Sequence, residues 1–217
     1  MSSIQKITLL LCDDNPDFLS TLKTLVTLQG NIQVLGEARN GSEGFSKIQE
    51  LKPEVVILDL GMPVMDGPSL IKKIRSSGLN TKIIVLSQNE NPDWLDQLIQ
   101  NEIDGFVLKS DSKDNILSAI ITVATGEKYF SPTVASLFYK KLTRQGGIQK
   151  SYDPAVELLT PKEKEVAKNT SKGFSVKEIA DAMGLSENTI KTHKSNLMKK
   201  INAKNSAEVT LWVLKNL

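Results

Sequence analysis

The sequence has few of the residues that build disulfide frameworks and soft-metal sites. Its 217 residues include one cysteine and one histidine, Cys12 and His193. An internal disulfide, a multi-cysteine zinc site and a multi-histidine metal cluster are therefore excluded. No apolar run approaches the roughly 20 residues needed to span a bilayer, and the first residues lack the basic and then apolar pattern of a signal peptide. These absences favour a cytoplasmic protein that does not enter a membrane.

What is present is a composition suited to a packed core, with an uneven distribution of charge. Hydrophobic residues make up 40% of the chain, which argues against disorder. Residues 1–126 carry 11 basic and 16 acidic side chains, a net charge of −5, whereas residues 127–217 carry 16 and 9, a net charge of +7. This asymmetry suggests an acidic domain joined to a module that binds a polyanion, although an ordinary solvated basic surface gives the same balance.

The first 126 residues alternate between apolar, strand-like runs and helical patterns. The five runs expected to form strands are residues 6–12, 32–36, 55–58, 81–86 and 105–108. Helical spacing of apolar residues follows each run; the fourth helix is expected to begin at Pro92 and the fifth to stop at Gly126. The alternation predicts a flavodoxin-like, doubly wound α/β fold with a parallel five-stranded sheet.

Polar side chains follow these strands at the points where the strands end. Right-handed crossovers place the carboxyl ends of all parallel strands at one edge of the sheet, where ligands bind. The residues expected at this edge are Asp13, Asp14, Asp59, Ser87 and Lys109. Three carboxylates in one crevice repel each other unless a cation lies among them, and oxygen ligands beside phosphate suit Mg²⁺. A carboxylate can also act as a nucleophile and form an aspartyl phosphate, although Asp59 alone could simply begin a turn.

The same residues, together with Met62-Pro63 and Asp66-Gly67, resemble the receiver domain of two-component response regulators. The resemblance covers residues 1–126 and implies that Asp59 accepts a phosphoryl group from a sensor histidine kinase. It also implies that Mg²⁺ is bound by Asp13, Asp14, Asp59 and the carbonyl group of Gly61.

Further roles follow from the resemblance. Lys109 and Ser87 are expected to contact the phosphoryl group, and Phe106 is expected to follow Ser87 inward as the switch aromatic. The alternative for Phe106 is an ordinary core residue, which a phenylalanine on a strand often is. Two positions depart from the commoner receiver pattern: Gln88 stands where a small residue is usual, and Ser110 stands where many receivers have proline. Gln88 is expected to narrow access to Asp59.

The remaining residues predict a connector and a small helical domain. Residues 127–153 are expected to form a helix that begins at 129–132 and a flexible linker at 144–151. Within residues 154–217, four helix starts are expected, at Thr160, Ser175, Ser186 and Asn205. A tight turn at Gly184 separates the second and third of these helices, which predicts a helix-turn-helix.

The third of these helices has a polar and basic face that suits DNA. Amide, ammonium and hydroxyl groups suit the major groove, and lysines suit phosphates. The candidate DNA-binding residues are Asn188, Lys191, Thr192, Lys194, Ser195 and Lys199. The alternative is a helical hairpin with a solvated basic face.

Three segments of this region resemble the LuxR-type helix-turn-helix: residues 159–166, 177–180 and 189–193. Together with the receiver-like segment, they make the whole chain resemble response regulators of the NarL/FixJ type. Two departures are Val176, where asparagine is frequent, and Ser206, where arginine is frequent. The resemblance implies a homodimer that forms on phosphorylation and binds double-stranded promoter DNA. The last helix is expected to supply the dimer interface through Val209, Trp212 and Val213, with a place in the domain's own core as the equal alternative for Trp212.

The sequence therefore predicts a regulator of transcription that is not an enzyme. One alternative is a regulator that ignores phosphate and uses its receiver as a dimerisation or ligand module. The other is a phosphohydrolase with Asp59 as its nucleophile. Hydrolases of the haloacid dehalogenase type carry a second acid two residues after the nucleophile, where this chain has Gly61, so the second alternative is weak.

Overall fold

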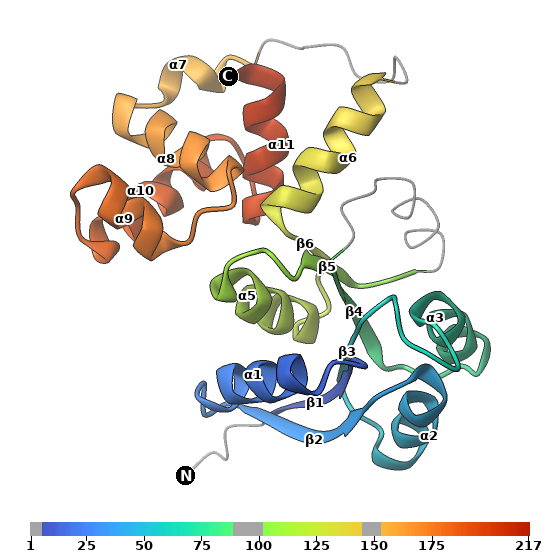
Figure 1. Cartoon of the computed structure of the whole chain (residues 1–217). Coiled ribbons are helices and arrows are strands. Elements are labelled where there is room, and N and C mark those ends of the chain that lie inside the picture. Colours follow the sequence, from blue (N-terminus) through green and yellow to red (C-terminus); the bar gives the residue numbers. More distant parts are fainter. Residues whose placement is uncertain (1–5, 89–101, 145–152) are drawn as a thin grey trace. The chain divides into compact units, whose positions relative to one another are not determined.

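A computed structural model describes residues 6–88, 102–144 and 153–217 of the chain. The helix predicted from Pro92 lies outside the described residues, as does nearly all of the predicted linker at 144–151. The chain divides into two compact units (Figure 1), of which the first is Met1–Lys109 with Ile116–Tyr129 and the second is Ser110–Asn115 with Phe130–Leu217.

The first unit is built on a twisted sheet. Its strands are β1 (Ile7–Cys12), β2 (Ile32–Ala38), β3 (Val55–Leu58), β4 (Lys82–Ser87), β5 (Gly105–Leu108) and β6 (Tyr129–Phe130). The strand order is β2-β1-β3-β4-β5-β6, and the first five strands pair in parallel. The doubly wound fold is confirmed, but the expected strand number of five is wrong by one. Residues expected to begin a helix form β6 instead, where the Tyr129 amide donates to the Asp104 carbonyl at 2.9 Å.

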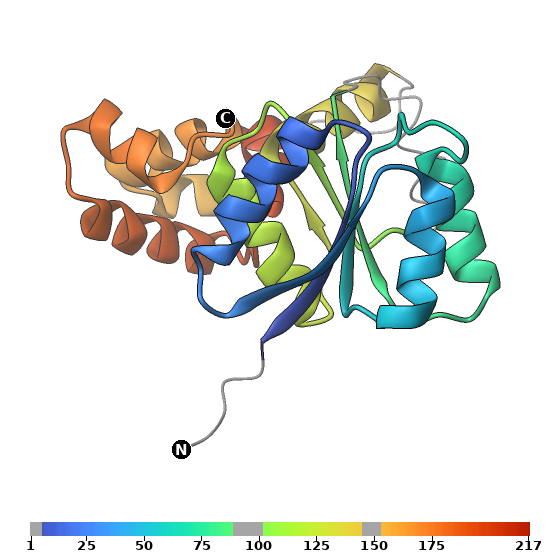
Figure 2. The same ribbon diagram turned by 60° about the horizontal axis from the view of Figure 1, so that its bottom comes forward.

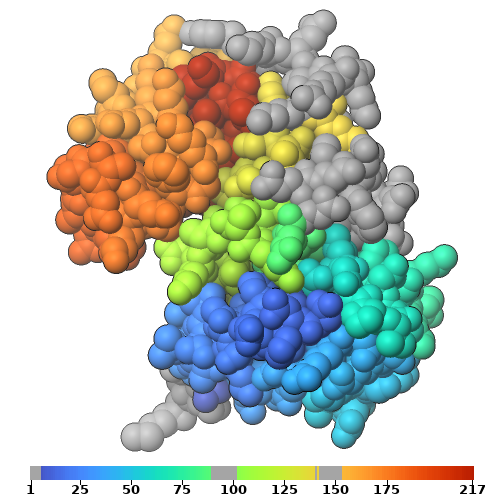
Figure 3. All heavy atoms as spheres, viewed as in Figure 1, coloured from blue at the N-terminus to red at the C-terminus, as the bar shows by residue number. Residues whose placement is uncertain are grey.

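Helices cover both faces of the sheet. Helices α1 (Pro16–Thr27) and α5 (Lys113–Ala124) lie on one face, and α2 (Gly41–Leu51) and α3 (Gly67–Ser76) lie on the other (Figures 1 and 2). The surfaces of α1 and α5 adjoin in the space-filling view (Figure 3). Strand β1 is buried on both faces, as a continuous apolar run predicts, and Leu9 and Leu11 belong to the core under α1 and α5.

Side-chain caps fix where three of these helices begin. The side chains of Asn15, Asn40 and Asp66 accept hydrogen bonds from backbone amides in the first turns of α1, α2 and α3. Each cap satisfies amides that have no partner within the helix. Two of the caps, Asn15 and Asp66, lie in loops that follow β1 and β3, so they also fix the carboxyl edge of the sheet.

Cys12 ends β1 as a small apolar residue. Its side chain is buried, and burial together with the nearby Glu43 carboxylate raises the pKa of the thiol to about 12. Because the thiolate is the reactive form of cysteine, Cys12 acts in packing rather than in redox chemistry.

The second unit is helical. Its helices are α6 (Pro132–Arg144), α7 (Ala155–Leu158), α8 (Pro161–Ser171), α9 (Val176–Met183), α10 (Glu187–Lys200) and α11 (Ser206–Asn216). The four helices expected after residue 154 are present, and the short α7 was not expected. Among the described residues, no helix is long and apolar enough to span a membrane.

Glu163 joins two of these helices. Its carboxylate accepts hydrogen bonds from the Thr160 backbone amide at 2.8 Å and from Lys200 Nζ at 2.8 Å, while its side chain is 4% exposed. Burial alone would raise the pKa of Glu163, but the hydrogen bonds from Lys200 and Thr160 outweigh burial and lower this pKa. The buried carboxylate therefore caps α8 and ties it to the end of α10.

We expect Glu163→Ala to destabilise the second unit by about 2 kcal/mol at neutral pH, because it removes a cap and a charged hydrogen bond. A carboxylate with a lowered folded pKa stabilises the fold above its unfolded pKa and loses that effect as pH falls through the folded value. The difference from the wild type should therefore narrow in acid. Urea unfolding at several pH values measures it.

The matched control is Glu178→Ala. Glu178 accepts from the Ser175 amide at 2.7 Å in an equivalent cap of α9, but it is exposed. We expect it to cost about 1 kcal/mol or less. Equal losses in the two variants would contradict a role for the contact with Lys200.

Candidate functional site

A cavity opens at the carboxyl edge of the sheet in the first unit. Its volume is about 410 Å³. The residues that line it are Asp14, Asn15, Asp59, Leu60, Gly61, Ser87, Gln88 and Lys109. The structure thus brings together four predicted site residues, Asp14, Asp59, Ser87 and Lys109, which lie at or just after the ends of β1, β3, β4 and β5. Gln88 lines the same cavity, as its expected effect on access requires.

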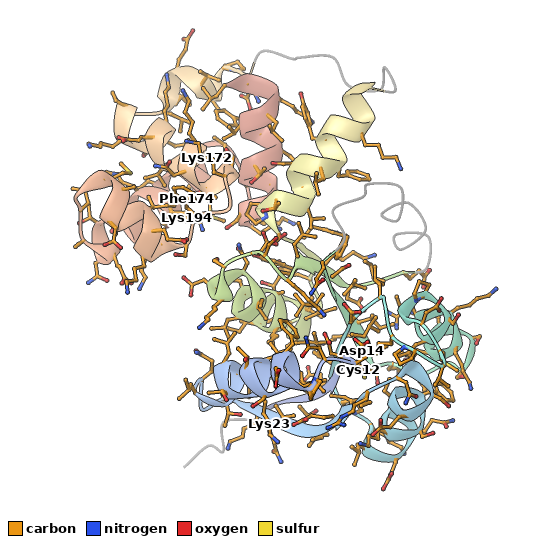
Figure 4. The ribbon with its side chains drawn as sticks, viewed as in Figure 1. Cys12, Asp14, Lys23, Lys172, Phe174 and Lys194 are labelled. Atoms are coloured by element: carbon orange, nitrogen blue, oxygen red, sulfur yellow. The ribbon has the colours of Figure 1, made fainter. Side chains whose placement is uncertain are left out.

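Backbone hydrogen bonds continue the sheet past the strand ends and hold these residues in place. The Asp59 amide donates to the Cys12 carbonyl at 2.9 Å, and the Lys109 amide donates to the Ser87 carbonyl at 2.8 Å. The backbone at Asp59 and at Lys109 is therefore held by a neighbouring strand. Asp14 lies two residues beyond the end of β1, near Cys12 (Figure 4).

Lys109 lies between two acids. Its Nζ is 2.6 Å from Asp13 Oδ2 and 3.0 Å from Asp59 Oδ1. The Lys109 side chain is 9% exposed, and those of Asp13 and Asp59 are 4% and 11% exposed. Burial lowers the pKa of Lys109, but hydrogen bonds to Asp13 and Asp59 outweigh it and raise this pKa. The lysine therefore stays charged within the site.

Asp13 experiences the opposite balance. Burial raises the pKa of Asp13, and the nearby Asp59 carboxylate adds to this effect, against the hydrogen bonds from Lys109 and the Asn15 amide. Burial thus outweighs the stabilisation that Lys109 gives to the Asp13 carboxylate. A further cation would relieve the repulsion.

Both carboxylate oxygens of Asp59 have a polar partner. Oδ2 accepts a hydrogen bond from the Gly61 amide at 2.6 Å, and Oδ1 contacts Lys109. The loop that follows is packed tightly, since a Cβ added to Gly67 would lie 2.5 Å from the Asp59 carbonyl oxygen. The carboxylate is therefore oriented toward the cavity by both its charge partner and its loop.

The acids do not form a closed metal cage. Among residues 6–88, 102–144 and 153–217, no group of three acidic, histidine or cysteine side chains is placed to hold a metal ion. The Lys109 ammonium takes the place between Asp13 and Asp59. The carboxylates of Asp14 and Asp59 nevertheless line the cavity beside Gly61, and these hard oxygen donors suit Mg²⁺.

The other two predicted site residues are buried. Ser87 ends β4, lines the cavity and is 3% exposed. Phe106 lies on β5, is 3% exposed and pairs in register with Val85. Phe106 does not line the cavity, so its position is that of a core residue within the sheet.

Sequence reasoning missed Phe18, which contacts the site lysine. Its ring centroid is 4.5 Å from Lys109 Nζ. Phe18 also has the spacing of an inward-facing residue of α1, so no sequence pattern sets it apart. Only the fold brings the first turn of α1 to the end of β5.

The second unit contains the expected helix-turn-helix. Helix α9 ends at Gly184, which has φ +63°, and the Leu185 amide donates to the Ala180 carbonyl at 3.0 Å. Glycine adopts this left-handed conformation without a steric penalty. Ser186 then caps α10, so the chain turns sharply between the two helices.

Helix α10 exposes most of the candidate DNA-binding residues. The exposed ones are Asn188, Lys191, Thr192, Ser195 and Lys199. The sixth candidate, Lys194, has intermediate exposure, and desolvation lowers the pKa of its ammonium. A hollow of about 510 Å³ is lined by residues that include Lys191, Lys194, Ser195 and Lys199. These four side chains therefore share one basic surface.

The candidate dimer residues lie in the core of the second unit. Val209, Trp212 and Val213 are 0%, 9% and 7% exposed and pack in one cluster. Trp212 Nε1 donates to Asp153 Oδ2 at 2.5 Å, which also lowers the pKa of Asp153. The structure thus gives these residues a packing role, and their surface exposure does not support the predicted interface.

Comparison with known proteins identifies both units. Residues 9–121 match the family model described as the response regulator receiver domain, and residues 157–213 match bacterial regulatory proteins of the luxR family. The chain therefore belongs to the response regulators, as a transcriptional regulator with a receiver domain and a LuxR-type domain.

Individual relatives span the whole chain. The nitrate/nitrite response regulator protein NarL of Escherichia coli (strain K12) is 30% identical over 213 residues, which cover 98% of this chain and 97% of NarL. A structure of the RcsB response regulator of Salmonella typhimurium has a TM-score of 0.61 and 28% identity, and the match covers 97% of this chain and 99% of RcsB. A structure of two RcsB dimers bound to two parallel DNAs matches with a TM-score of 0.60, 28% identity and coverage of 98% and 99%.

Proposed function

We propose that Asp59 is the phosphoacceptor of this response regulator and that its phosphorylation controls DNA binding by the second unit. The observation that carries the proposal is the contact of Lys109 Nζ with both Asp13 and Asp59, at 2.6 and 3.0 Å, beside an open cavity. The phosphodonor is a sensor histidine kinase, by the family resemblance.

The reaction is a transfer between two side chains. A phosphohistidine of the kinase loses its phosphoryl group as the P–N bond breaks, and an oxygen of the Asp59 carboxylate forms the new P–O bond. The imidazole takes up a proton as it leaves. Lys109 and the hydroxyl of Ser87 then hold phosphoryl oxygens. The ammonium of Lys109 thereby exchanges its carboxylate partners for the more strongly charged phosphoryl group.

Mg²⁺ fits this donor set. Asp13, Asp14 and Asp59, with the Gly61 carbonyl group, are the residues that would hold it, and Asp14 and Asp59 already line the cavity. When bound, the ion supplies positive charge against the carboxylates and the phosphoryl oxygens. In the structure, the carboxylates of Asp13 and Asp59 hold Lys109 Nζ at 2.6 and 3.0 Å, and Lys109 lines the cavity.

The test is the intact mass of the protein after incubation with Mg²⁺ and acetyl phosphate. We expect the wild type to gain one phosphoryl group and the Asp59→Asn variant to gain none, because an amide cannot act as the nucleophile. The matched control is Asp66→Asn, which alters an acid at the cap of α3 and should be phosphorylated like the wild type. A gain at Asp59→Asn equal to that of the wild type, or none in the wild type with its cognate kinase also present, would refute the proposal.

Phosphorylation is proposed to shift a two-state receiver through Ser87 and Phe106. The phosphorylated chain then binds double-stranded promoter DNA as a homodimer through α10. The similar structure of two RcsB dimers bound to two parallel DNAs supports a dimer on DNA. The predicted contacts of Val209, Trp212 and Val213 with a second copy remain part of this proposal. They require rearrangement of a buried cluster.

DNA binding should depend steeply on salt. We expect Lys191→Ala and Lys199→Ala each to reduce the slope of log affinity against log salt by about 1, because each removes one phosphate contact. The control is Lys23→Ala, which removes a lysine that pairs with Glu37 at 2.9 Å in the first unit. Fluorescence anisotropy with a promoter fragment measures the slopes; the same slope in all four proteins would count against this face.

The remaining parts of the proposal follow from this role. A regulator of transcription acts where the DNA is, so we assign the chain to the cytoplasm and give it no catalytic activity on a separate substrate. The alternative of a phosphate-independent receiver predicts that Asp59→Asn leaves DNA affinity unchanged after treatment with acetyl phosphate. A phosphatase assay tests the hydrolase alternative, which Gly61 disfavours.

A further inference from the structure

The Lys109 ammonium has an aromatic neighbour as well as two acidic ones. The ring centroid of Phe18 lies 4.5 Å from Lys109 Nζ. A cation this close to the face of an aromatic ring is attracted by the ring's quadrupole, and the attraction is stronger when the cation is removed from water. The Lys109 side chain is 9% exposed, which meets that condition.

The ring is held in place by the same turn that presents Asp13. The Asn15 amide donates to Asp13 Oδ1 at 3.0 Å, and Asn15 Oδ1 accepts from the Phe18 amide at 3.1 Å. The Phe18 side chain is partly buried and packs against the core under α1. Ring, acid and helix cap thus form one local unit at the start of α1.

The ring also differs chemically from the other neighbours of the ammonium. A lysine has a flexible four-carbon stem and three N–H donors. Asp13 and Asp59 accept from these donors at 2.6 and 3.0 Å. The ring attracts the cation without taking the place of an oxygen acceptor, so it restrains the ammonium while leaving its donors for oxygens in the cavity.

We propose that Phe18 is a positioning residue for phosphoryl transfer, because its ring holds the Lys109 ammonium where the phosphoryl oxygens at Asp59 will lie. This inference rests on the proposed function of Asp59. Without the ring, the ammonium spends more time away from the cavity, and the developing charge on the phosphoryl group is less well offset.

The test replaces Phe18 by phenylalanines that carry one, two and three fluorine atoms. Fluorine withdraws charge from the face of the ring and nearly preserves its shape, so packing changes little while the attraction for a cation falls. We expect the rate of phosphoryl incorporation from acetyl phosphate, with Mg²⁺, to fall stepwise and to end about threefold to tenfold lower. Intact mass against time gives the rates.

The matched control is the same series at Phe45. Its ring centroid lies 4.4 Å from Lys73 Nζ, in a second cation–π pair of the first unit that includes no residue of the cavity. Fluorination at Phe45 should leave the phosphorylation rate unchanged. Rates that do not change along the Phe18 series, or that fall equally in both series, would overturn the inference.

Two ordinary substitutions test the inference further. Phe18→Tyr keeps an aromatic face and should retain most of the rate, whereas Phe18→Leu keeps apolar bulk and should lose as much as the trifluorinated residue. A wild type that incorporates no phosphoryl group from acetyl phosphate or its kinase would refute the proposed function, and this inference with it. A phosphorylated wild type with a rate insensitive to fluorine would refute this inference alone.

Discussion

Replacing Lys109 by methionine is expected to destabilise the first unit by about 3 kcal/mol in the absence of divalent cations. Methionine preserves much of the apolar stem but removes the ammonium that contacts the buried carboxylates of Asp13 and Asp59, at 2.6 and 3.0 Å. Two buried acids without a cation repel each other and are poorly solvated. Hydrogen exchange of the peptides that contain β1 and β3 measures the loss in the full chain.

The control for this substitution is Lys23→Met. Lys23 pairs with Glu37 at 2.9 Å, but its side chain is 55% exposed, so the loss should be below about 1 kcal/mol. We expect Mg²⁺ to recover part of the stability of Lys109→Met and none of that of Lys23→Met. Similar losses in both variants would show that Lys109 does not offset a buried charge.

Replacing Gly67 by alanine is expected to cost the first unit about 3 kcal/mol and to slow phosphorylation of Asp59. The added Cβ would lie 2.5 Å from the Asp59 carbonyl oxygen and 2.7 Å from Leu60 Cα. Both neighbours are backbone atoms, so the loop after β3 or the start of α3 must move. Urea unfolding and the rate of phosphoryl incorporation report the two effects.

Gly78→Ala is the matched control. Gly78 has φ +67° and no atom within 4 Å of an added Cβ, so alanine there meets conformational strain but no clash. We expect a cost of about 1 kcal/mol and an unchanged phosphorylation rate. If Gly67→Ala had the same stability and phosphorylation rate as Gly78→Ala, the close packing around Asp59 would not contribute to either property.

Much of the first unit follows from local sequence. Strand β3 is a run of four apolar residues followed directly by Asp59, and all four are buried. The caps at Asn15, Asn40 and Asp66 are likewise local, because each side chain accepts from an amide two or three residues further along the chain. Because parallel strands end at one edge of the sheet, the order of strands and helices was enough to bring Asp14, Asp59, Ser87 and Lys109 to one cavity.

Other features depend on contacts between residues far apart in the chain. The sixth strand forms because the Tyr129 amide donates a hydrogen bond to the Asp104 carbonyl. This strand has only two residues, so local sequence does not predict it. Trp212 was an equal candidate for an interface and for the core; in the structure its side chain is 9% exposed, packs in the helical cluster and donates to Asp153 at 2.5 Å. Both outcomes were set by the partner that tertiary packing supplied.

Local sequence specifies the alternation of strands and helices, most helix starts and the type of side chain at each strand end, because periodicity and capping act over a few residues. Tertiary structure decided how those side chains share charge. The position of Lys109 between Asp13 and Asp59, its contact with Phe18, and the link from Glu163 to Lys200 all join separate elements. Such distances depend on how the elements pack, and no local pattern specifies them.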